Sequence, residues 1–234
     1  MTPRALIFDK DGTLFDFQAT WGLWSRGLIL AEAEGNTARA TSIATALGYD
    51  LASGRFLPDS PVVASTPGEI ADVMLPHLPG TNRATLVARM NARAARAPQV
   101  EAVPLLPLFE RLAARGLGFG LVTNDAEAPA RAHLGVAGLT EVFGFIAGAD
   151  SGYGAKPGPG QLLSCARALG RLPAECAMIG DSLHDLHAAR AAGMRAIAVL
   201  TGPAPRHVLE PHADAVLDDI GGLPDWLDSL LTKA

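Results

Sequence analysis

The stretch ALIFDKDGT, residues 5–13, decides how this chain folds. Four apolar residues lead directly into Asp9 and Asp11, which is typical of a buried strand whose carboxyl end carries charge. Two carboxylates one residue apart can face one reacting atom, so that one attacks phosphorus and the other protonates the leaving oxygen. Gly12 lets the backbone offer amides to phosphate oxygens. A surface Asp-x-Asp-Gly turn is the alternative interpretation of this stretch alone.

The chain beyond residue 104 alternates between strand-like and helical segments. Gly116, Gly170 and Gly193 follow three of the helices, as helix-ending glycines do. Alternation of this kind predicts an α/β, Rossmann-like core with a parallel sheet that is covered on both faces. We expect strands at 4–8, 119–123, 142–146, 177–179, 196–200 and 215–217, and helices at 105–115, 126–134, 159–169 and 183–192.

Residues 16–100 follow a different pattern, with helices expected over 18–34 and 36–47. A third helix begins at the capping box of Thr66 and Glu69, and a fourth begins at Thr81 and ends before Pro98. No convincing strand is present. We predict an all-α domain, 16–100, inserted into a core formed by 1–15 and 101–234, with linkers near 14–17 and 98–104.

Two further polar stretches suit a phosphate group. Thr123 and Asn124 end an apolar strand, where a hydroxyl and free backbone amides can hold phosphate oxygens, although a turn opening the next helix is the simpler reading. Lys156, in the run Lys-Pro-Gly-Pro, is one of three lysines and supplies a compact positive charge. We predict that Gly12, Thr123, Asn124 and Lys156 bind phosphate.

A carboxylate pair follows the strand expected at 177–179. Asp181 and Asp185 are four residues apart where that strand gives way to a helix, so both can point to one side. Carboxylate oxygens suit Mg²⁺, whereas a helix cap by Asp181 with a solvated Asp185 is the alternative. Because strand carboxyl ends converge in an open α/β sheet, all four stretches should meet in one crevice.

Composition narrows the class of function. A net charge of −5 argues against nucleic acid as a partner. Two cysteines are too few for a disulfide framework. No signal-peptide pattern and no run near ~20 apolar residues is present, which argues against a membrane. We therefore expect a soluble, cytoplasmic protein whose partner is a small phosphorylated metabolite.

These motifs resemble the haloacid dehalogenase superfamily, and within it the phosphoglycolate-phosphatase-like hydrolases. The resemblance covers roughly 4–16 and 104–228, and it implies a Mg²⁺-dependent phosphatase with a helical cap at 16–100. It makes Asp9 the nucleophile and metal ligand, and Asp11 the general acid and base, which also lends its backbone carbonyl to Mg²⁺. Asp181 would ligate the metal, with Asp185 in support.

Alternatives remain within the same fold. A dehalogenase has no use for Asp11 or a metal, and a phosphonatase needs a cap lysine that 16–100 lacks. A phosphomutase of the beta-phosphoglucomutase type shares every core residue, and a non-catalytic regulatory protein is a more distant option. Arg26 and Arg55 are candidates for contacting the leaving group, whereas Trp21 and Trp24 are interpreted as cap core. The substrate and the oligomeric state stay open.

Overall fold

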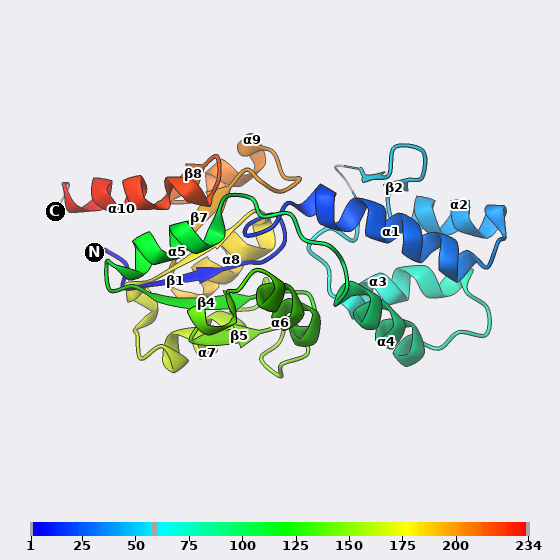
Figure 1. Cartoon of the computed structure of the whole chain (residues 1–234), viewed down its shortest axis with the longest axis horizontal. Coiled ribbons are helices and arrows are strands. Elements are labelled where there is room, and N and C mark those ends of the chain that lie inside the picture. The colour runs from blue at the N-terminus through cyan, green and yellow to red at the C-terminus, as the bar shows by residue number, and fades with distance from the viewer. Residues whose placement is uncertain (1, 58–59, 233–234) are drawn as a thin grey trace.

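The computed structural model describes residues 2–57 and 60–232 and places a sheet beside a group of helices (Figure 1). Six parallel strands run in the order β5-β4-β1-β6-β7-β8, which confirms the α/β prediction. Strand β1 lies inside the sheet, so its end meets the ends of β4 and β6. The strands are β1 Ala5–Phe8, β4 Gly118–Val122, β5 Phe145–Ala147, β6 Cys176–Gly180, β7 Arg195–Val199 and β8 Ala215–Leu217.

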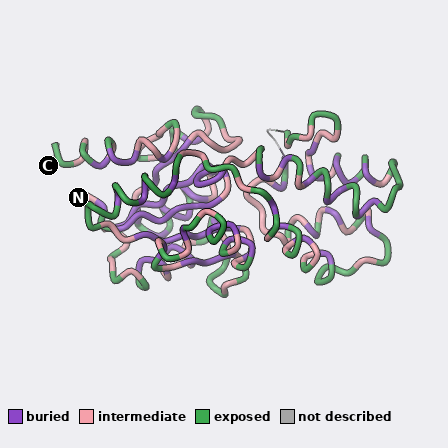
Figure 2. Tube along the Cα trace, viewed as in Figure 1, coloured by how far each residue is buried: buried purple, intermediate pink, exposed green. Residues whose placement is uncertain are grey.

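Helices cover both faces of this sheet, so the central strands lie in the most buried part of the core (Figure 2). Successive residues of a strand point to opposite faces, so Leu6 and Phe8 pack on one side and Ala5 and Ile7 on the other. The first face carries α5 Leu105–Ala113, α6 Glu127–Val136 and α10 Leu223–Leu231. The second carries α7 Gly160–Ala168, α8 Leu183–Ala192 and α9 Arg206–Leu209.

The inserted segment has a hydrophobic core of its own, which runs from Leu28 to Met90. Its helices are α1 Phe17–Ala33, α2 Thr37–Ala46, α3 Pro67–Met74 and α4 Arg83–Ala94. The capping box predicted at Thr66 is present, since Thr66 and Glu69 bond reciprocally. We call residues 16–100 the cap.

The expectation of a cap without strands is wrong in one detail. An antiparallel ribbon pairs β2 Tyr49–Asp50 with β3 Arg55–Phe56. Its turn is closed by Asp50, whose carboxylate accepts the Ala52 amide at 2.9 Å, and by Gly54 at φ +71°. Two-residue strands are too short to show an alternating pattern.

The two connections between core and cap run side by side. The Asp16 amide donates to the Val100 carbonyl at 2.8 Å, and the Ala102 amide donates to the Leu14 carbonyl at 2.9 Å. These bonds lie within or beside the linkers expected at 14–17 and 98–104. The division into domains at 15/16 and 100/101 stays a prediction.

Other segments differ modestly from the sequence expectations. The strand expected at 142–146 begins only at Phe145, because Thr140–Val142 forms a 3₁₀ turn. Helix α10 was not anticipated. Further 3₁₀ turns are Leu75–His77, Pro173–Glu175, Glu210–His212 and Ile220–Gly222.

No helix in the described ranges 2–57 and 60–232 is both long and apolar enough to cross a membrane.

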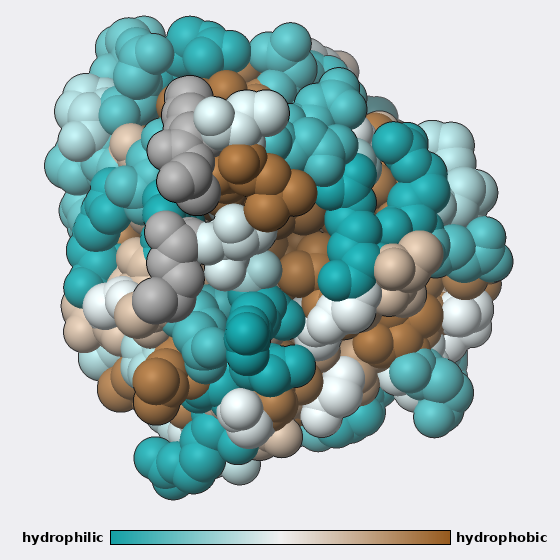
Figure 3. Space-filling model, turned by 90° about the vertical axis from the view of Figure 1, so that its left-hand side faces the viewer, coloured by the Kyte–Doolittle hydropathy of each residue, from teal (hydrophilic) through white to brown (hydrophobic). Residues whose placement is uncertain are grey.

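The end of the molecule at which both termini lie is seen face-on in Figure 3. Hydrophilic side chains cover most of that face, with smaller apolar patches between them. It lies at the opposite end of the molecule from the cap (Figure 1).

Replacing Phe109 by alanine should destabilise the core strongly. Its ring is 2% exposed and lies 5.1–5.2 Å from the rings of Phe8, Phe119 and Phe143. A buried Phe→Ala change costs about 3–5 kcal/mol, measurable by urea unfolding. Leu106→Ala, on the same helix but 46% exposed, is the matched control and should cost less than about 1 kcal/mol. Equal losses would contradict this account of the core.

Candidate active site

The polar stretches identified in the sequence meet at the carboxyl ends of the central strands. Asp9 follows β1, Thr123 follows β4 and Asp181 follows β6, while Lys156 comes from the loop between β5 and α7. All four side chains line one pocket between the sheet and the cap. Their residue-by-residue roles stay predictions, but the convergence expected from the topology is present.

Lys156 lies at the base of this pocket and is 4% exposed. Its ammonium donates to Asp9 Oδ1 and to Asp185 Oδ1, both at 2.6 Å, and to the Val122 carbonyl at 3.1 Å. Three acceptors use all three ammonium protons. The two carboxylates raise the pKa of Lys156 in spite of its burial, so this lysine stays charged.

The carboxylates outnumber the cations in this site. Burial raises the pKa of Asp9 to about 7; Lys156 opposes the shift, while Asp185 and Asp11 add to it. Burial also raises the pKa of Asp181 well above its usual range, with the negative charges of Asp9 and Asp185 contributing. Such raised pKa values indicate that a further positive charge would be stabilising here.

The donor set fits a hard divalent cation. Oxygens of Asp9, Asp181 and Asp185 lie within 4.8 Å of one another, and all three residues are buried. Asp185 is already engaged, because its Oδ2 accepts the Ser182 hydroxyl at 2.6 Å and its Oδ1 accepts Lys156. Asp9 and Asp181 could therefore serve as direct ligands, with Asp185 in support, and this assignment stays a prediction.

Two glycines leave room for the Asp181 carboxylate. A Cβ added at Gly12, whose φ is +77°, or at Gly202 would collide with Asp181 Oδ2. Thr201 fixes this corner by donating its hydroxyl to the Gly12 carbonyl at 2.6 Å. Sequence reasoning missed Thr201 and Gly202, although their place two and three residues after the end of β7 marks another strand end at the same edge.

The side chain of Asn124 has a different role from the one predicted. Its carboxamide donates to the Lys156 carbonyl at 2.9 Å and to the Ala64 carbonyl of the cap at 2.8 Å. It also accepts the Lys156 amide at 2.9 Å. Because these backbone groups occupy the carboxamide, Asn124 positions Lys156 and a cap loop, and phosphate contact by this residue stays a prediction for its main chain.

Lys10, which lies between the two catalytic candidates, is fully buried. Its ammonium contacts the Asp11 carboxylate at 2.6 Å, Asp125 at 3.4 Å and His133 Nδ1 at 3.1 Å. It also lies 5.2 Å from the ring centroid of Trp21. Burial and the Lys10 charge lower the pKa of His133 to about 4, so this imidazole is neutral near pH 7. No motif or spacing in the sequence indicates this cluster.

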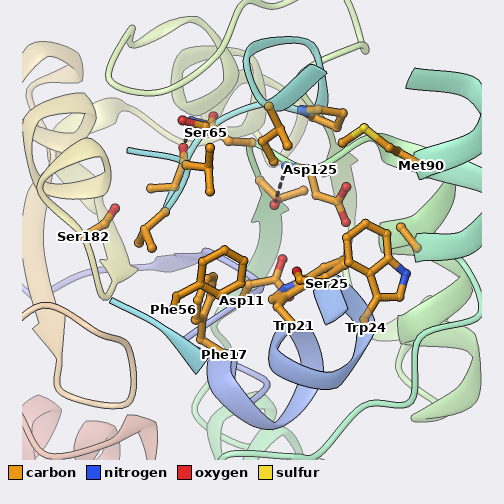
Figure 4. Close-up of a pocket in the computed structure, with 18 of the residues that line it drawn as sticks. Asp11, Phe17, Trp21, Trp24, Ser25, Phe56, Ser65, Met90, Asp125 and Ser182 are labelled. Atoms are coloured by element: carbon orange, nitrogen blue, oxygen red, sulfur yellow. Dashed lines mark hydrogen bonds between the residues drawn. The ribbon is translucent and has the colours of Figure 1, made fainter. Parts of the chain in front are cut away.

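The cap half of the pocket corrects two expectations (Figure 4). Arg26 and Arg55 are both exposed and neither is among the residues lining it. Trp21 and Trp24, interpreted as cap core, both line it, together with Phe17 and other apolar side chains. For Trp24 the interpretation is also correct, because this side chain packs against the cap core as well. Charge alone suggested the arginines, but both face solvent outside the pocket.

Residues 3–193 match a family of known proteins, described as haloacid dehalogenase-like hydrolases. The chain belongs to this family.

Relatives of this hydrolase include named phosphatases. Phosphoglycolate phosphatase of Rhodospirillum rubrum is 38% identical over 122 residues, 52% of this chain and 51% of that protein, so the match spans about half its length. Hexitol phosphatase B of Escherichia coli strain K12 is 32% identical over 220 residues and 90% of each chain. The crystal structure of beta-phosphoglucomutase from Clostridium difficile shares the fold, with TM-score 0.69, 18% identity, and coverage of 98% and 99%.

Gly202→Ala should weaken the metal site of this haloacid dehalogenase-like hydrolase without unfolding it. The added methyl group would displace the Asp181 carboxylate. We expect the Mg²⁺ concentration for half-maximal activity to rise at least about 10-fold, measured by phosphate release against Mg²⁺. Gly27→Ala, where a Cβ meets open space on helix α1, is the control. An unchanged Mg²⁺ requirement in Gly202→Ala would refute this role for Asp181.

Proposed function

We propose that this hydrolase cleaves small phosphomonoesters through a phosphorylated Asp9, with Mg²⁺ as the cofactor. The observation that carries the proposal is the placement of Asp9: one carboxylate oxygen is held by Lys156 at 2.6 Å, and the group lies at the strand edge beside Asp11 and Asp181. A carboxylate held this way is aimed at the pocket, where a phosphate group can be presented to it.

In the first step Asp9 attacks phosphorus while the ester oxygen leaves. Asp11, two residues further on and lining the same pocket, donates a proton to that oxygen. In the second step Asp11 takes a proton from water, which attacks phospho-Asp9 and releases inorganic phosphate. Thr123 and the Gly12 backbone bind the phosphate oxygens, which carry the charge of the transition state. Lys156 joins them by turning one N–H from the Val122 carbonyl, the longest of its three hydrogen bonds at 3.1 Å, to a phosphate oxygen.

Asp9, Asp181 and the Asp11 backbone carbonyl would hold the metal, with Asp185 in support. When bound, Mg²⁺ supplies the positive charge that offsets repulsion between the Asp9 carboxylate and a phosphate dianion. The surplus of buried carboxylates supports this part of the proposal, since Lys156 alone balances only one of them.

Hydrolysis is favoured over phosphoryl transfer to a second sugar hydroxyl. Both curated relatives reported above carry phosphatase names. The mutase neighbour is 18% identical, a level that supports only the shared fold. Product analysis separates the two activities, because a mutase isomerises a sugar phosphate without releasing phosphate.

The test is phosphate release from para-nitrophenyl phosphate and from a panel of alkyl phosphates, with and without Mg²⁺. We expect Mg²⁺-dependent turnover in the wild type and a loss of at least about 1,000-fold in Asp9→Asn, which removes the nucleophile while nearly preserving shape. Thermal melting of both proteins checks folding. Equal inactivity of wild type and variant on every ester, or full activity of Asp9→Asn, would refute the proposal.

A further inference from the structure

The cap side of the pocket is apolar and aromatic, in contrast to the charged core side (Figure 4). Two ring pairs contribute to it: Trp21 and Trp24 with centroids 4.9 Å apart, and Phe17 and Phe56 with centroids 5.6 Å apart. The aliphatic lining includes Leu28, Val62, Val63, Ile70 and Met90. Its polar groups are few: Ser25, Ser65, Asn91 and the indole N–H groups, of which Trp24 Nε1 and Asn91 Oδ1 have no hydrogen-bond partner.

Positive charge is missing from this lining. Among the cap residues that the structure describes, those lining the pocket are all uncharged. Two cap arginines are held elsewhere, because Arg83 pairs with Asp72 and Arg89 with Glu32. The two undescribed positions in the cap, 58 and 59, are proline and aspartate and so carry no cation.

This lining disfavours the leaving groups suggested by the names of the relatives. A carboxylate buried here would lose its water without gaining a cation, and a chain of hydroxyl groups would lose more hydrogen bonds than these few polar groups can replace. An apolar group loses no such bonds and gains contact with four aromatic rings. An enzyme rejects a substrate more strongly when binding would leave buried polar groups without hydrogen-bond partners than when only apolar contacts differ.

We propose that the substrate is the phosphate ester of an uncharged, largely apolar alcohol that carries a ring. This inference rests on the proposed phosphatase function and names its substrate class. The phosphate would lie against Asp9 and Lys156, and the ring would lie against Trp21 and Phe17.

The test compares three alkyl phosphates, so that differences in leaving-group reactivity are small: 2-phenylethyl phosphate, a hexitol phosphate and phosphoglycolate. We expect kcat/KM for 2-phenylethyl phosphate to exceed both others at least 10-fold. Equal or better turnover of the other two, with Asp9 still required, would overturn the substrate class while leaving the phosphatase function intact. No Asp9-dependent turnover of any ester, para-nitrophenyl phosphate included, would overturn both.

A cation added to the cap lining should shift this preference. Val63 is partly exposed and lines the pocket, so it tolerates a longer side chain. Val63→Lys should raise the ratio of kcat/KM for phosphoglycolate over 2-phenylethyl phosphate about 10-fold relative to Val63→Gln, the uncharged control. An identical ratio in the two variants, with both shown to be folded by thermal melting, would contradict the assignment of this surface to the leaving group.

An independent observation concerns the path from the cap to Asp11. An ammonium has only donors, so Lys10 donates to His133 Nδ1, and the imidazole proton must then lie on Nε2. His133 Nε2 is 2.7 Å from the carbonyl of Ala94 at the end of α4, to which it donates. One continuous set of hydrogen bonds thus joins a cap helix, His133, Lys10 and Asp11.

We infer that Lys10 and His133 are positioning residues that hold the Asp11 carboxylate in place while α4 is docked on the core. Asp11 acts on the leaving oxygen, and a poor leaving group needs its proton more than a good one does. If Lys10 and His133 position Asp11, the fall in kcat after their substitution should be larger for esters with poor leaving groups. A general loosening of the fold should lower kcat equally for all esters.

The test is the leaving-group dependence of kcat in Lys10→Met. We expect kcat to fall about 10- to 100-fold on an alkyl phosphate and less than 3-fold on para-nitrophenyl phosphate, with KM nearly unchanged. His133→Phe should share this pattern, whereas His133→Gln, which can donate and accept, should stay within about 3-fold of wild type. Equal losses on both esters, or none on either, would contradict the inference.

Discussion

The ammonium of Lys156 is shared by two buried carboxylates, Asp9 and Asp185, at 2.6 Å each, and the remaining geometry of the site depends on that sharing. Removing one partner from a buried ion pair costs about 3–5 kcal/mol, because the other charge is left in a poorly solvated place. The loop that carries Lys156 is fixed in turn by the Asn124 carboxamide. One side chain thus holds both Asp9, the proposed nucleophile, and Asp185, the carboxylate proposed to support the metal. Even so, negative charge remains in excess, and this excess favours the binding of a further cation.

The sequence predicted the core of the site because each motif directly follows a strand, or lies in a loop at the same edge of the sheet. Asp9, Thr123 and Asp181 could be placed together because each follows an expected strand, and the carboxyl ends of parallel strands lie at one edge of the sheet. The Lys10–His133 contact could not, because 123 residues separate the partners and α6 shows no pattern that turns His133 inward. The prediction that Arg26 and Arg55 contact the leaving group was wrong for a related reason. Charge identifies a candidate residue, but the packing of the helices decides which side chains face the pocket.

Core and cap divide the chemistry between them. The core side of the pocket is charged and the cap side is apolar. In the proposed mechanism the core binds the phosphate and the cap contacts the remainder of the ester. Among the described residues, two hydrogen bonds join the side chains of the core to the backbone of the cap: Asn124 donates to the Ala64 carbonyl, and His133 donates to the Ala94 carbonyl. Each contact links a cap backbone group to a core residue that positions a charged group, Lys156 in the first case and Lys10 with Asp11 in the second. Direct contacts therefore link the position of the cap to the positions of Lys156, Lys10 and Asp11.

The central claim is that Asp9 itself becomes phosphorylated during turnover. The most direct measurement is rapid acid quenching of the enzyme with an alkyl phosphate and Mg²⁺, followed by borohydride reduction and peptide mass analysis. Borohydride converts an acyl phosphate to an alcohol, so the account predicts homoserine at position 9 in quenched wild-type enzyme and unmodified Asp9 in enzyme quenched without substrate. Phosphate release with Asp9 unmodified at every quench time, or with the label on another residue, would contradict it.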